Sequence, residues 1–69
     1  MTQKEIGSTL RILRGVKSVE VIANLIGVSV KTYQAYESGA RNPSDPVKIR
    51  IAHLYGKTVG ELFFGESNT

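Results

Sequence analysis

The sequence predicts an all-α fold, a compact five-helix bundle that forms a single domain over residues 1–69. Apolar residues recur at helical spacing along the chain, and no alternating strand pattern of useful length is present. Residues that commonly begin or end helices stand at the junctions between these apolar stretches. The chain is near the lower limit for a domain that folds without disulfides or metals, because a short chain buries a small fraction of its surface.

A glycine ends the first predicted helix, and a serine begins the second. Ile6, Leu10 and Leu13 follow the i, i+4, i+7 pattern of a helix with one buried face, and Gly15 marks its end. Ser18 is a suitable N-cap for the second helix, because its hydroxyl can accept a hydrogen bond from a free backbone N–H of the first turn.

The second and third predicted helices are separated by a tight turn. Ile22 and Ile26 point inward from the second helix, and Gly27 follows directly, as expected for a left-handed C-terminal cap. Ser29 then caps a third helix that runs to about Ser38, where the next glycine closes it.

The last two predicted helices also carry start signals. Ser44 or Asp45 would cap a fourth helix, with Pro46 in its first turn, where a missing N–H costs nothing. Thr58 caps a short fifth helix, and Glu61 at its N3 position completes a capping box.

The fourth helix is expected to present two solvated cations. Val47, Ile51 and Leu54 line its inner face, which turns Lys48 and Arg50 outward.

Composition favours a polyanionic partner. Nine Lys and Arg against six Asp and Glu give a net charge of +3. Cysteine is absent and His53 has no partner cluster, so we expect no disulfide, no metal site and no cofactor. No apolar run approaches the roughly 20 residues that span a bilayer, and the start lacks the apolar core of a signal peptide. A cytoplasmic protein is expected, with a frayed tail at about residues 65–69.

The segment from Ser18 to Ser44 has the features of a helix-turn-helix. In that motif the second helix enters the DNA major groove by its N-terminal residues, while the first lies across the backbone. Gly27 allows the tight turn, and the small Ala23 lets the two helices interlock at close range. Polar or small side chains occupy the outer face of the reading helix, between the buried positions Tyr33 and Tyr36.

Motifs spread over most of the chain support this interpretation. They are Leu13-Arg14, Ile22-Ala23, Ile26-Gly27-Val28-Ser29, Thr32-Tyr33, Tyr36-Glu37-Ser38-Gly39, Arg41-Asn42-Pro43-Ser44, Ile51-Ala52 and Glu61-Leu62-Phe63. In this pattern the chain resembles the lambda-repressor-like helix-turn-helix family, also called Xre or Cro type. The resemblance implies a sequence-specific DNA-binding transcriptional regulator, most simply a repressor of bacterial, phage or mobile-element origin.

Two departures from the family pattern concern the second helix. Val19 stands where the family usually has a polar residue that contacts a phosphate, so that side-chain contact is absent. The connection from the first helix to Ser18 is also shorter than is common, which leaves the placement of the first helix on DNA open.

Five residues of the third helix are candidates for reading bases. Lys31 can donate to guanine, and Gln34 can pair with adenine. Val30 and Ala35 can touch a thymine methyl group, and Thr32 can contact a base or a phosphate. The alternative for each is that it merely covers an exposed helix face.

Other residues match family positions with supporting roles. Ser29, Arg41 and Asn42 are the candidates for phosphate contact, which supplies affinity and salt dependence but no sequence information. For Ser29, capping alone is a sufficient explanation. The resemblance also implies a structural ion pair between Arg14 and Glu37.

A homodimer is expected, formed either in solution or only on DNA, since paired half-sites overcome the limited affinity of one short helix. Phe63 and Phe64 exceed what the last helix needs for inward packing, and we expect one of them, Phe64, to lie at the dimer interface. The alternative is that both rings pack into the bundle. Val19, Val21 and Leu25 on the second helix form an alternative contact patch.

Two other functional classes are alternatives to a transcriptional regulator. An antitoxin, or another protein-interaction module with the same fold, would bind a toxin or regulatory protein as its main partner. An enzyme is not expected, because paired carboxylates, a nucleophile–base arrangement and a phosphate-binding glycine loop are all missing.

Overall fold

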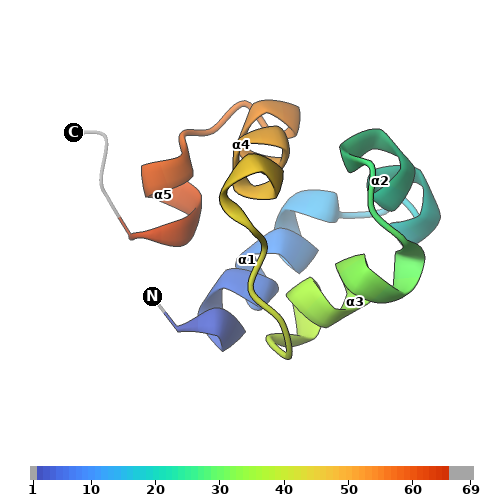
Figure 1. Ribbon diagram of the computed structural model, residues 1–69, viewed down its shortest axis with the longest axis horizontal. Coiled ribbons are helices and arrows are strands. Elements are labelled where there is room, and N and C mark those ends of the chain that lie inside the picture. The colour runs from blue at the N-terminus through green and yellow to red at the C-terminus, as the bar shows by residue number, and fades with distance from the viewer. Residues whose placement is uncertain (1, 66–69) are drawn as a thin grey trace.

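Five α-helices occupy residues 2–65, the part of the chain that the computed structural model describes (Figure 1). The helical fold class is therefore confirmed; of the expected frayed tail, residues 66–69 lie outside the described residues. None of the described helices is long and apolar enough to cross a membrane. The helices are α1 (Gln3–Arg14), α2 (Val19–Ile26), α3 (Val30–Ser38), α4 (Asp45–Leu54) and α5 (Val59–Phe63).

The helices α2 to α5 begin at the residues that the sequence predicted. The hydroxyls of Ser18, Ser29 and Thr58 each accept a hydrogen bond from the backbone N–H at position N3. Glu61 completes the capping box of α5 by accepting the Thr58 backbone N–H at 2.9 Å. Ser44 is the N-cap of α4, but its side chain makes no capping hydrogen bond.

Gly27 makes the turn between α2 and α3 as predicted. Its φ of 77° is in the left-handed region, which glycine adopts without steric cost. The Gly27 N–H donates to the Asn24 carbonyl at 3.3 Å, and the Val28 N–H donates to the Ala23 carbonyl at 3.0 Å. These bonds satisfy carbonyls at the end of α2 and let the chain reverse within two residues.

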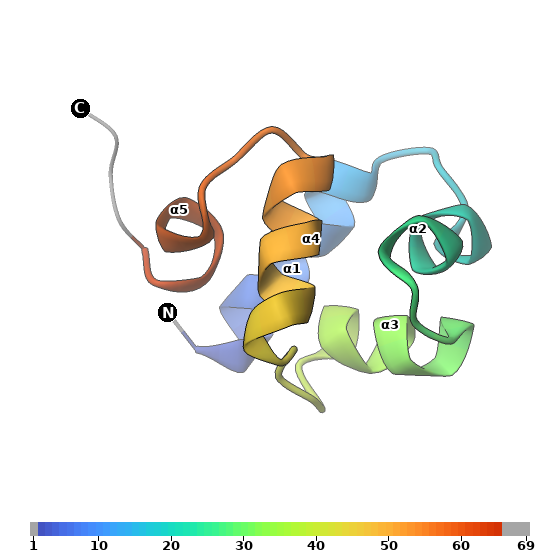
Figure 2. The ribbon, with the colours of Figure 1, turned by 45° about the horizontal axis from the view of Figure 1, so that its top comes forward.

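The core lies between all five helices. α1 packs on α3 and α5, while α4 packs on α2 and α5. In Figure 2, α4 lies in front of α1 at the centre, with α5 on one side and the α2–α3 pair on the other. The buried apolar residues are Ile6, Leu10, Ile22, Ala23, Ile26, Tyr33, Tyr36, Ile51, Ala52, Leu62 and Phe63.

Lys48 is not solvated as predicted. Its residue exposure is 9%, and its ammonium lies 5.7 Å from the centre of the Phe63 ring and 5.2 Å from that of Phe64. The same ammonium lies 3.9 Å from Oδ1 of Asp45. The prediction failed because α5 folds back against α4 and covers the outer edge of that helix, where the ammonium gains cation–π contacts.

Candidate nucleic-acid interface

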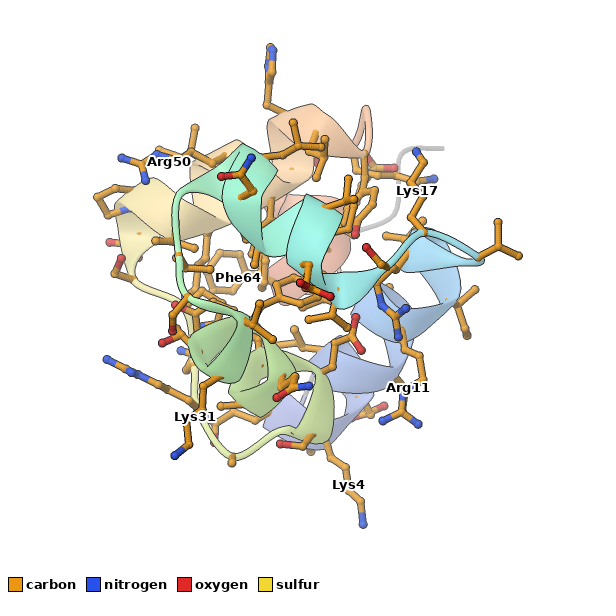
Figure 3. All side chains as sticks on the ribbon, turned by 90° about the vertical axis from the view of Figure 1, so that its right-hand side faces the viewer. Lys4, Arg11, Lys17, Lys31, Arg50 and Phe64 are labelled. Carbon is orange, nitrogen blue, oxygen red and sulfur yellow. The ribbon has the colours of Figure 1, made fainter. Side chains whose placement is uncertain are left out.

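The helix α3 presents a mixed face to solvent. Val30, Lys31 and Gln34 are exposed, while Thr32 and Ala35 are half-buried. Figure 3 shows Lys31 pointing away from the body of the protein. The opposite face, formed by Tyr33, Tyr36 and Glu37, is buried. The five base-reading candidates thus share the outward side of one helix.

The start of α3 is unusual in its charge. The other four described helices each carry an acidic residue in the first turn, namely Glu5, Glu20, Asp45 and Glu61, whereas α3 carries none. Instead it has Lys31 there, which the positive end of a helix disfavours by about 0.3–1 kcal/mol. The start of α3 is therefore positive both from its backbone N–H groups and from its side chain, a setting that favours a bound anion.

Ser29 and Thr32 form a closed hydrogen-bonded cap. The Ser29 Oγ accepts the Thr32 backbone N–H at 3.1 Å and donates to the Thr32 Oγ1 at 2.8 Å. The proton of Ser29 is thereby used within the protein, whereas the hydroxyl proton of Thr32 remains available. Of these two, Thr32 is the better placed to donate to DNA.

The loop after α3 is ordered by its backbone and leaves its polar side chains in solvent. The N–H groups of Ala40 and Arg41 both donate to the Ala35 carbonyl, at 3.0 and 3.2 Å. Pro43 is buried and anchors the loop, while Arg41 and Asn42 are exposed. The two phosphate candidates of this loop therefore extend from a fixed backbone next to the end of α3.

The C-terminal half of α3 lies directly on the backbone of α1. A Cβ added to Gly7 would overlap the Glu37 carbonyl oxygen and lie 2.8 Å from the Tyr36 carbonyl oxygen. A Cβ on Gly39 would lie 2.9 Å from the Cα of Lys4. Only glycine at these positions allows the two helices to approach so closely.

An ion pair reinforces this contact. The Arg14 Nε donates to Glu37 Oε2 at 2.7 Å and its Nη2 donates to Oε1 at 3.1 Å, a bidentate arrangement. The side chains are 19% and 6% exposed, and hydrogen bonding to Glu37 raises the pKa of Arg14. Arg14 also donates from Nη1 to the Lys17 carbonyl at 2.8 Å, so one guanidinium links α1, α3 and the α1–α2 loop.

A second polar contact joins α3 to the end of α4. The hydroxyl groups of Tyr33 and Tyr55 lie 3.1 Å apart, within hydrogen-bonding distance. Burial raises the pKa of Tyr33, so its hydroxyl stays protonated across the usual pH range. The Tyr33 hydroxyl therefore makes its contact inside the protein, with Tyr55.

The two dimer candidates differ in burial. Phe63 is 3% exposed and belongs to the core, so it offers no surface to a partner in this structure. Phe64 is 59% exposed, so of the two phenylalanines it is the remaining candidate for a dimer contact. In the alternative patch, Val21 and Leu25 are exposed, but Val19 packs against the core.

Sequence reasoning missed two residues that support the site. Gly7 was not singled out, although a glycine inside a helix is a signal of close packing. Arg50 was expected to be solvated, yet its Nη1 donates to the Ile26 carbonyl at the end of α2, at 3.2 Å. Within residues 2–65, no group of three His, Cys, Asp or Glu side chains could hold a metal ion.

Comparison with known proteins agrees with the helix-turn-helix arrangement of α2 and α3. The model of a helix-turn-helix domain family matches residues 5–62. The chain is 42% identical over 53 residues to the cryptic phage CTXphi transcriptional repressor RstR of Vibrio cholerae, covering 77% of this chain and 47% of that protein. It is 40% identical over 45 residues to the HTH-type transcriptional regulator AnsR of Bacillus subtilis, covering 65% of this chain and 39% of that protein. The chain thus spans less than half the length of these curated relatives, and no solved structure matches it significantly.

Proposed function

The chain belongs to the Xre-like helix-turn-helix family, and we propose that it is a sequence-specific DNA-binding transcriptional regulator that represses by occupying an operator. The observation that carries the proposal is the start of α3, which is exposed, free of acid and positive, and stands on a helix whose other face is buried. Two relatives are named as a transcriptional repressor and a transcriptional regulator. A regulator of this kind acts in the cytoplasm, where bacterial DNA lies.

In this proposal, the exposed side chains divide into two groups. Lys31 and Gln34 read base edges in the major groove, with Val30, Thr32 and Ala35 making closer contacts at the same face. Arg41 and Asn42 hold the sugar-phosphate backbone from the following loop, with Ser29 acting mainly as the cap. Arg14 and Glu37 stay inside and hold α3 in place. No cofactor or chemical step is involved.

Selection of bound duplexes from a random-sequence pool tests the function directly. Recovery of one enriched motif would support a sequence-specific regulator, and two-fold symmetry in that motif would indicate that the chain binds as a homodimer. Exposed Phe64 is the proposed contact between the two copies. Failure to enrich any sequence, with no saturable binding above nonspecific DNA at any salt concentration, would reject the proposal. A stable complex with a toxin in native lysate would instead favour the antitoxin function.

Point variants separate base contacts from phosphate contacts. Lys31→Ala and Gln34→Ala should each cost about 1–3 kcal/mol on the selected duplex and relax the preference at one position. Arg41→Ala should weaken binding to all duplexes alike and reduce the slope of log affinity against log salt by about 1. Lys57→Ala, in the exposed loop between α4 and α5, is the control for loss of one positive charge. Identical behaviour of the Lys31 and Arg41 variants would show that this division of contacts is wrong.

A further inference from the structure

Arg50 reaches from α4 to the turn of the helix-turn-helix. Its Nη1 donates to the carbonyl of Ile26, the last residue of α2, at 3.2 Å. A Cβ placed on Gly27 would lie 3.4 Å from the same nitrogen, so the guanidinium sits against the turn. Figure 3 shows Arg50 beside the end of α2.

The end of α2 lacks its own means of satisfying this carbonyl. Helix C-termini leave carbonyl groups without intrahelical partners and carry a partial negative charge. The Gly27 and Val28 N–H groups serve the carbonyls of Ala23 and Asn24, not that of Ile26. The last turn of α2 also contains no basic residue. Arg50 therefore supplies from another helix both the donor and the positive charge that α2 does not have.

The position of this turn determines where α3 begins. Only Val28 and Ser29 separate Gly27 from the first residue of α3, so a shift of the turn moves the start of the helix with it. The other end of α3 is fixed separately, by the contact of its backbone with Gly7 on α1. Arg50 thus acts, through the turn at Gly27, on the end of α3 that carries the reading side chains.

We propose that Arg50 is a positioning residue for DNA recognition. It fixes the turn of the helix-turn-helix against α4 and thereby sets the position of the first residues of α3. The inference rests on the proposed function and adds to it a residue that touches no base. Because Arg50 is exposed and makes one hydrogen bond, its effect should appear in recognition more than in overall stability.

Hydrogen exchange without DNA tests the contact itself. Arg50→Ala should speed amide exchange of Val28 and Thr32, whose N–H groups donate to the Ala23 carbonyl and the Ser29 hydroxyl, by about fivefold relative to the amides of α1. Local opening becomes easier in this variant, while global unfolding is little changed. Arg50→Lys, which keeps a charged donor, should recover part of the protection, and Lys57→Ala should have no effect. Unchanged exchange at the turn, or a uniform increase over the whole chain, would overturn the inference.

Binding to DNA tests the consequence. On the duplex that the wild-type chain selects from a random pool, Arg50→Ala should weaken binding about threefold to tenfold, with little change on a scrambled duplex and no change in salt slope. Equal losses on both duplexes with a flatter salt slope would show that Arg50 contacts a phosphate, which contradicts the positioning role. If the wild-type chain selects no duplex, the proposed function fails and the role in recognition falls with it, while the exchange result still reports on the contact with Ile26.

Discussion

The two ends of α3 are held in different ways. The C-terminal end lies on the backbone of α1, where Gly7 leaves no side chain between the helices and Arg14 pairs with Glu37. The N-terminal end is held by the Ser29 cap and, through α2, by the single hydrogen bond from Arg50. One end of α3 is therefore fixed by close packing and a buried ion pair, and the other leaves its side chains exposed.

This difference predicts that substitutions of the residues that hold the two ends of α3 differ in their effects. Changes at the buried end should unfold the domain, because close backbone contacts and a buried ion pair have no simple replacement. Changes at the exposed end should alter recognition while leaving most of the free energy of unfolding in place. Three variants test how sharp the division is.

Gly7→Ala should have the largest effect on stability. The added Cβ would overlap the Glu37 carbonyl, so α1 and α3 must move apart. We expect the free energy of unfolding to fall by about 3 kcal/mol, which exceeds the helix-propensity gain of about 0.5–1 kcal/mol for this replacement. Thermal and urea unfolding followed by circular dichroism would measure it. Ser8→Ala, at the exposed neighbouring position of α1, should change stability little, and equal stability of the two variants would refute the close contact.

Glu37→Ala should come second, at about 2 kcal/mol. It leaves the Arg14 guanidinium without its bidentate partner, but Arg14 is 19% exposed and keeps its bond to the Lys17 carbonyl, so the cost is below that of a fully buried pair. The matched control is Arg11→Ala, since Arg11 lies 4.0 Å from Glu37 and is 67% exposed. A melting temperature unchanged by Glu37→Ala would argue against a stabilising ion pair.

Ser29→Ala should have the smallest effect, about 1 kcal/mol, because it removes the side-chain cap of α3. Ser44→Ala provides a direct comparison, since Ser44 occupies the same N-cap position of α4 without a side-chain hydrogen bond. That variant should lie within about 0.5 kcal/mol of the wild type. The denaturant midpoints of the two variants would measure the difference. Equal losses in the free energy of unfolding would mean that the hydrogen bond of the Ser29 hydroxyl contributes nothing.

The features that sequence predicted correctly are those that depend on neighbours along the chain. Ser18, Ser29 and Thr58 cap helices through bonds to residues three positions away, and Gly27 makes a turn through its own φ. Such signals are complete within one stretch of sequence. The five helices could therefore be located in the sequence, and the exposed side of α3 could be assigned from the helical spacing of its buried residues.

The features that sequence missed depend on how helices pack. Helical spacing puts Lys48 and Arg50 on the outer side of α4. In the structure, Lys48 reaches the aromatic rings at the end of α5, and Arg50 reaches the end of α2. Gly7 looks like a weak helix position until α3 is placed against it. Contacts across the bundle of this kind require the angles and separations of helices, which local pattern does not contain.

The charges of α3 have a consequence for how the protein must work. Lys31 at its start and Glu37 near its end both oppose the helix dipole, and the segment is only nine residues long. Released as a peptide, this segment would be a random coil and would carry no readable surface. Recognition of the proposed operator therefore requires the folded domain, so operator DNA should raise its melting temperature, by an amount that increases with the logarithm of the DNA concentration above Kd.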